Sequence, residues 1–129
     1  MRRVILDTSV FIARETGRAL SELPDDSETA ISVISIAELR IGVLTADSAQ
    51  TRARRLSTLE AALRDHEPLP VDESVAAAFA ELVVMVRSAG RNPRILDSLI
   101  AATALAYGAT VATQDDDFAG LPGVTILRV

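Results

Sequence analysis

The sequence predicts an α/β domain in which a central parallel sheet of four to five strands carries helices on both faces. Short apolar runs rich in β-branched residues alternate with longer segments whose apolar residues recur at helical spacing. The chain has 129 residues, 49% of them hydrophobic, and no break in composition, so we expect one domain over residues 1–129 with a core of its own.

The first elements follow from short local signals. Residues 4–6 form an apolar run that Asp7-Thr8-Ser9 ends, which predicts a buried strand leading into a helix. A turn is expected at residues 24–27. Residues 29–33 are rich in β-branched side chains, which predicts a second strand. Ser35 and Glu38 then have the spacing of a capping box, and the apolar residues up to position 44 continue on a helical period.

The middle of the chain predicts two further helices with a short strand between them. Residues 48–65 should form a helix that turns its arginines outward and three leucines inward: Leu56, Leu59 and Leu63. Residues 68–71 are expected to be an edge strand, because each of the two prolines there removes a ladder donor. Asp72 can cap a helix over residues 73–88 whose inward residues are Val75, Phe79, Leu82, Val83 and Val86.

The last third predicts a central helix and the remaining strands. Residues 95–107 are apolar nearly all round, so that helix should be central, and Gly108 ends it. Residues 110–113 and 124–127 are expected to be the last two strands, with an acidic loop after the first of them.

Composition excludes several kinds of chemistry. The chain has no cysteine, which removes disulfides and thiolate sites and suits the cytoplasm. All 13 basic residues are arginines, so no lysine is present for a Schiff base or a phosphate-binding loop. The net charge of −5 argues against indiscriminate coating of nucleic acid but allows an enzyme that grips a short RNA through a cation. No apolar run is long enough for a membrane span, and no glycine fingerprint for an organic dinucleotide cofactor is present.

Acidic residues follow the strands and begin the helices of the predicted sheet. Asp7 follows the first strand, Asp115 follows the strand at 110–113, and Glu38 and Asp97 lie in the first turns of helices. Because ligands of an open parallel sheet bind beyond the carboxyl ends of its strands, we expect these four acids at one rim. Clustered carboxylates repel one another, and a hard dication such as Mg²⁺ or Mn²⁺ relieves that repulsion.

Each acid also has a purely structural interpretation. Asp7 could cap the following helix, and Glu38 could close a capping box with Ser35. Asp97 could be a first-turn acid favoured by the helix dipole. An acidic run such as residues 115–117 is usually a solvated loop.

The motifs containing these acids resemble, in order, those of PIN-domain nucleases. They are Val4-Ile5-Leu6-Asp7-Thr8-Ser9, Ser35-Ile36-Ala37-Glu38-Leu39, Leu96-Asp97-Ser98-Leu99-Ile100-Ala101-Ala102 and Thr113-Gln114-Asp115-Asp116-Asp117-Phe118. Within that family the chain is similar to the VapC toxins of bacterial VapBC toxin–antitoxin systems. Each motif is weak alone, but together they span nearly the whole chain.

The resemblance implies a PIN-like fold and a Mg²⁺- or Mn²⁺-dependent endoribonuclease, the toxin of a type II toxin–antitoxin system. It implies that Asp7, Glu38, Asp97 and Asp115 are catalytic, with Asp7, Asp97 and Asp115 as metal ligands and Asp117 as an alternative to Asp115. The hydroxyls it implies beside the metal belong to Thr8 or Ser9, and to Thr113. Asp116 is expected to face solvent.

The resemblance also implies partners: an RNA substrate, a second copy in a homodimer, and a VapB-type antitoxin that wraps the toxin. The segments over residues 36–44 and 48–63 are candidate antitoxin surfaces, although apolar helix faces are more often core. Arg91 and Arg94 stand just before Asp97 and are the best candidates for RNA phosphates, ahead of Arg14 and Arg40. The alternative function is a catalytically silent PIN-like module that acts only by binding protein.

Overall fold

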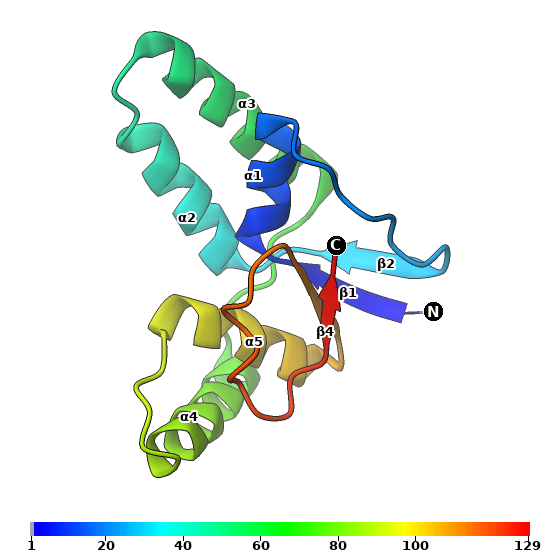
Figure 1. The fold of residues 1–129 in the computed structure, drawn as a ribbon, viewed down its shortest axis with the longest axis vertical. Coiled ribbons are helices and arrows are strands. Elements are labelled where there is room, and N and C mark those ends of the chain that lie inside the picture. The colour runs from blue at the N-terminus through cyan, green and yellow to red at the C-terminus, as the bar shows by residue number, and fades with distance from the viewer. Residues whose placement is uncertain (1) are drawn as a thin grey trace.

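A four-stranded parallel sheet lies at the centre of the computed structural model, which describes residues 2–129 (Figure 1). The strands are β1 (Arg2–Leu6), β2 (Ser27–Ala30), β3 (Thr110–Thr113) and β4 (Ile126–Arg128). They lie in the order β2-β1-β3-β4, and every pairing is parallel, with Val4 opposite Thr29 on one side and Thr110 on the other. The predicted α/β architecture is confirmed.

Helices cover both faces of this sheet (Figure 1). The chain forms α1 (Thr8–Thr16), α2 (Val33–Leu44), α3 (Ala49–Asp65), α4 (Glu73–Ser88) and α5 (Ile95–Tyr107). The first three pack together on one face, α4 and α5 pack together on the other, and α2 and α3 form a hairpin that extends away from the sheet. Within the described residues, none of these helices is both long and apolar enough to cross a membrane.

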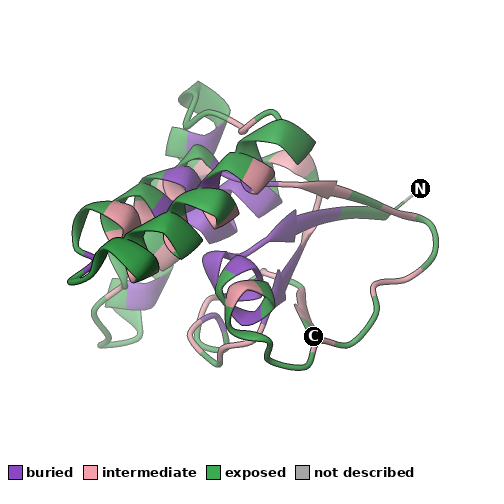
Figure 2. Cartoon of the chain, turned by 90° about the horizontal axis from the view of Figure 1, so that it is seen from above, coloured by how far each residue is buried: buried purple, intermediate pink, exposed green. Residues whose placement is uncertain are grey.

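The alternation of side chains along β1 divides the core into two layers. In Figure 2 the buried residues lie in the strands and on the helix segments beside them. Val4 and Leu6 contribute to the layer beneath α1, α2 and α3, where every member of the cluster is buried. Ile5 points to the opposite face and packs with buried residues of α4, α5 and the loop after β3, namely Leu82, Ile100 and Phe118. A strand buried on both faces explains the unbroken apolar run at its end.

The strongest local signals gave the correct elements. Asp72 caps α4, and its Oδ1 accepts a hydrogen bond from the backbone N–H of Val75 at 3.0 Å. Gly108 ends α5 in the left-handed conformation, with φ 63°, which glycine adopts without steric cost. These outcomes confirm the predicted helices over 73–88 and 95–107.

The boundary between β2 and α2 differs from the prediction. The strand ends at Ala30, and Ser32 caps α2, because its Oγ accepts a hydrogen bond from the backbone N–H of Ile34 at 3.0 Å. The capping box assigned to Ser35 and Glu38 is therefore wrong: Ser35 lies inside α2 and is fully buried. This removes the structural interpretation that competed most strongly with a functional role for Glu38.

The edge strand predicted over residues 68–71 is also wrong. Only Leu69 forms a bridge, parallel to Ser32, donating to the carbonyl of Ile31 at 2.8 Å and accepting from Val33 N–H at 2.9 Å. The pairing does not extend past this bridge, because the partner segment enters α2 at Val33.

Part of α3 is less buried than its pattern predicts. Leu59 is buried, whereas Leu56 and Leu63 are 41% and 40% exposed. The α2–α3 hairpin projects beyond the sheet, so much of its apolar surface has no covering layer within the described chain (Figure 1).

Candidate functional site

The predicted acids line one pocket at the carboxyl-end rim of the sheet. Asp7 follows β1, Asp115 follows β3, Glu38 lies in the first half of α2, and Asp97 lies in the first turn of α5. The pocket has a volume of about 240 Å³, and its lining includes these four acids with Asp117, Thr8, Ser9, Ile12, Arg18 and Arg94. Side chains from four separate parts of the chain therefore meet there.

Asp7 is the most buried of these acids, with 4% of its surface exposed. It caps α1, as one of its two interpretations expected, with its Oδ2 3.4 Å from the backbone N–H of Ser9. The same Oδ2 accepts shorter hydrogen bonds from Ser9 Oγ at 2.7 Å and Thr113 Oγ1 at 3.0 Å. Capping and pocket lining are compatible, because the described hydrogen bonds of the Asp7 side chain all involve Oδ2 and leave Oδ1 for a ligand.

The hydroxyls of Ser9 and Thr113 link Asp7 to the loop after β3. Ser9 Oγ accepts from the backbone N–H of Gln114 at 3.0 Å, and Thr113 Oγ1 accepts from that of Asp115 at 3.0 Å. Each hydroxyl thus donates to Asp7 and accepts from the loop. The position of the Asp115 backbone is therefore tied to the carboxylate of Asp7.

A third hydroxyl orients Glu38. Thr8 Oγ1 donates to Glu38 Oε1 at 2.7 Å and lies 3.0 Å from the Oγ of buried Ser35. Ser35, which the sequence suggested as a helix cap, instead supports this contact from inside α2.

Arg94 joins the two remaining acids. Its Nε lies 3.0 Å from Asp97 Oδ2, and its Nη1 lies 2.9 Å from Asp117 Oδ1. Asp116 points away from the pocket, is 85% exposed at its side chain and pairs with Arg128. The expectation that Asp116 faces solvent is confirmed.

Burial and mutual repulsion raise the pKa values of three of the acids. Burial raises the pKa of Asp97 to about 6; Arg94 opposes this rise, and the charges of Asp117, Asp7 and Glu38 add to it. Burial also raises the pKa of Glu38 against the opposing hydrogen bond from Thr8, and raises that of Asp115 with repulsion from Asp7. Several negative charges therefore share one poorly solvated space.

The pocket has an excess of negative charge. With every group ionised, the five carboxylates in its lining face only two guanidinium groups, those of Arg18 and Arg94. In residues 2–129, however, no three acidic or histidine side chains stand close enough together to surround a metal ion. Arg94 and the hydroxyls hold the carboxylates in other contacts, so cation binding would require rearrangement of side chains.

Of the arginines predicted to contact RNA phosphates, only one lies in the lining of the pocket. Arg94 lines the pocket, whereas Arg91, Arg14 and Arg40 are not among its lining residues. Arg91 packs against Gly120, and Arg14 lies over the ring of Phe11 at 5.6 Å. Arg18 was not predicted to line the pocket. The sequence offers one signal for it, because Arg18 directly follows Gly17, the glycine that ends α1 in the left-handed conformation.

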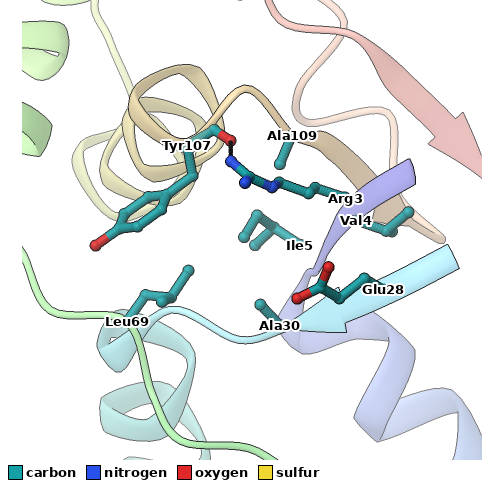
Figure 3. A pocket seen from close by; sticks show the side chains of 8 residues that line it. All are labelled: Arg3, Val4, Ile5, Glu28, Ala30, Leu69, Tyr107 and Ala109. Carbon is teal, nitrogen blue, oxygen red and sulfur yellow. Dashed lines mark hydrogen bonds between the residues drawn. The ribbon is translucent and has the colours of Figure 1, made fainter. Parts of the chain in front are cut away.

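A larger cavity of about 440 Å³ lies elsewhere, lined by residues of β1, β2 and the end of α5 (Figure 3). Its Arg3 guanidinium donates to the backbone carbonyl of Tyr107 at 3.0 Å, so it stabilises the end of a helix. Glu28 is the only acid in its lining within the described chain. This cavity has no cluster of reactive groups.

Comparison with known proteins relates the chain to one family. A family model described as PIN domain matches residues 4–124. The chain is 48% identical to Ribonuclease VapC5 of Mycobacterium tuberculosis, covering 97% of this chain and 94% of that protein. It is 44% identical to Ribonuclease VapC4 of the same organism, covering 100% and 98%.

The fold also matches a solved structure over its full length. A crystal structure of VapBC-5, a member of the VapBC family of toxin–antitoxin systems from Mycobacterium tuberculosis, superposes with a TM-score of 0.88. It is 46% identical in sequence, and the match covers 100% of both chains.

Proposed function

Because this chain belongs to the PIN-domain family, and within it to the VapC ribonuclease toxins of type II toxin–antitoxin systems, we propose that its acidic pocket is the place where RNA is cleaved. One observation carries this proposal: five carboxylates from four separate segments of the chain line the same small pocket. Structural caps would not need to converge, and burying repelling charges together is unfavourable without a ligand.

The donor set fits a hard divalent cation. Carboxylates and hydroxyls supply only oxygen ligands, which favours Mg²⁺ or Mn²⁺ over zinc. Asp7, Asp97 and Asp115 would hold the ion, with Asp117 as the alternative to Asp115. A cation bound there supplies Lewis acidity for hydrolysis of a phosphodiester by water.

The chain's own groups would orient the reactants and move the proton. Thr8 fixes Glu38 through Oε1, which leaves Oε2 free to take a proton from the attacking water. Because burial raises the pKa of Glu38, its carboxylate is a stronger base than an exposed one. Ser9 and Thr113 would keep Asp7 from turning away as RNA enters.

We also propose the partners and place of action that the family resemblance implies: RNA as substrate, a VapB-type antitoxin, a second copy of the chain, and the cytoplasm. The α2–α3 hairpin supports an antitoxin surface, because Ile41 and Leu44 are 53% and 73% exposed on it. Val84 and Met85 of α4, 61% and 53% exposed, are available to a second copy.

Cleavage of RNA by the purified chain, free of antitoxin, tests the proposal. Wild type should degrade a diverse RNA pool in Mn²⁺, and Asp7→Asn should lose about 100-fold or more of that activity. Asp116→Asn is the matched control, since it makes the same change on a side chain that faces solvent. Equal activity in wild type and Asp7→Asn would refute the site, and no activity on any RNA would favour the silent binding module.

A further inference from the structure

Arg94 bridges two carboxylates that come from distant parts of the chain. It stands at the N-terminus of α5 and makes no capping hydrogen bond with its side chain. Its guanidinium contacts Asp97 one turn along the helix and Asp117 in the loop after β3, at 3.0 Å and 2.9 Å. The arginine side chain is nevertheless 68% exposed.

We infer that Arg94 is a displaceable counter-ion that holds Asp97 and Asp117 while the pocket lacks a divalent cation, releases them when the cation binds, and then becomes free to contact an RNA phosphate. The inference rests on the proposed function, because it takes the acidic pocket as the cation site.

Competition follows from the atoms involved. The guanidinium contacts Asp97 Oδ2 and Asp117 Oδ1, oxygens on two of the carboxylates that could serve a cation. With the side chains in this arrangement, no three acidic or histidine side chains within residues 2–129 form a group able to surround a metal ion. A guanidinium and a dication repel each other, so each weakens the binding of the other at Asp97 even though that carboxylate has a second oxygen.

Release of Arg94 is feasible because the bridge is exposed on the arginine side. Ion pairs with a well-solvated partner contribute little to stability, since water replaces the lost contact. Asp97 itself is only 15% exposed, so it needs a positive partner more than the arginine needs a negative one. The carboxylate of Asp97 therefore has a positive partner both without the dication, from Arg94, and with it.

The released guanidinium would remain at the rim of the pocket. Its planar fork suits the paired oxygens of a phosphate as well as those of carboxylates. The same side chain would therefore neutralise the acids before cation binding and the substrate afterwards.

Titration of Mn²⁺ into metal-free protein, followed by calorimetry without RNA, tests the inference. We expect Arg94→Gln to bind Mn²⁺ about 3- to 10-fold more tightly than wild type, because the competing state is removed. Arg94→Lys keeps the charge without the fork and should fall between them. Arg91→Gln is the matched control: it loses the same charge three positions away, outside the pocket lining, and should stay within about 2-fold of wild type.

NMR of the arginine Nε–H groups provides a second readout. Addition of diamagnetic Mg²⁺ should shift the Arg94 signal and increase its exchange with water, while the Arg91 signal stays unchanged.

The outcomes separate this inference from the proposed function. If wild type binds Mn²⁺ and Asp7→Asn does not, but Arg94→Gln binds no more tightly than wild type, the counter-ion role is refuted and the cation pocket stands. If neither wild type nor Arg94→Gln binds Mn²⁺, the cation pocket is refuted, and the role of Arg94 with it.

Discussion

Replacing Asp97 with asparagine should stabilise the metal-free protein at neutral pH. The substitution keeps the size of a side chain that is only 15% exposed and removes its charge. Burial raises the pKa of Asp97 from 3.8 to about 6, so the folded protein holds its proton more tightly than the unfolded chain does. The charged form of Asp97 is therefore unfavourable to folding.

The direction of the pKa shift of Asp97 determines the pH range in which its charge lowers the stability of the protein. A carboxyl whose pKa is higher in the folded state costs nothing below about pH 3, where both states are protonated, and little at about pH 4. Stability then falls as the pH rises toward 6, and the full cost is present above about pH 7. A shift of this size corresponds to at most about 3 kcal/mol.

The net gain should be smaller than that maximum. Asparagine interacts less favourably than aspartate with the helix N-terminus, by about 0.3–1 kcal/mol. We therefore expect Asp97→Asn to be about 1–2 kcal/mol more stable than wild type at pH 8. Its melting temperature should be about 3–8 °C higher. Near pH 4 the two proteins should have nearly equal stability.

Thermal melts in EDTA between about pH 4 and pH 8 measure this difference. Asp116→Asn, whose exposed side chain pairs with Arg128, is the control and should show no comparable gain at high pH. Saturating Mn²⁺ should reverse the order, because an ion at 100 times its Kd stabilises wild type by about 2.7 kcal/mol and the variant less. Destabilisation of Asp97→Asn by the same amount at every pH in EDTA would refute the reasoning and support a purely structural role at the helix terminus.

Four further measurements test the site and the fold. Asp115→Asn should reduce RNA cleavage in Mn²⁺ about 100-fold, and Asp117→Asn about 10-fold or less, because Asp117 is held by Arg94 and Asp115 adjoins the Asp7 hydroxyl network; the reverse ranking in single-turnover assays would make Asp117 the ligand. EDTA should abolish cleavage, and Mn²⁺ should restore it to the same preparation; full activity in EDTA contradicts the cation requirement. Ser32→Ala should lower the free energy of unfolding by about 1 kcal/mol in urea titrations, because α2 loses its cap. An unchanged free energy of unfolding would show that Ser32 does not cap α2. Leu82→Ala should lower the free energy of unfolding by about 2–5 kcal/mol in the same titration, since Leu82 is 1% exposed in the core layer between the sheet and helices α4 and α5. A loss below about 1 kcal/mol would contradict the packing of that layer.

Local chemistry in the sequence was enough for the architecture and for the rim on which the acids lie. The apolar run before Asp7 predicted β1, and capping and helix-ending residues at 72 and 108 predicted one boundary each of α4 and α5. Once parallel strands are expected, an acid placed after a strand must lie at the carboxyl rim. Those signals act between chain neighbours, so they can be read without coordinates.

Only the tertiary structure decided which groups contact one another. Thr113 reaches Asp7 across 106 positions of sequence, and Arg94 reaches Asp117 across 23, distances over which no helical or strand period operates. The choice of Ser32 over Ser35 as the α2 cap depended on where β2 stops pairing with β1. The exposure of Leu56 and Leu63 depended on how far the α2–α3 hairpin extends past its covering layer. Chemical type and local period are set by neighbouring residues, whereas burial and pairing are set by segments that the chain brings together only on folding.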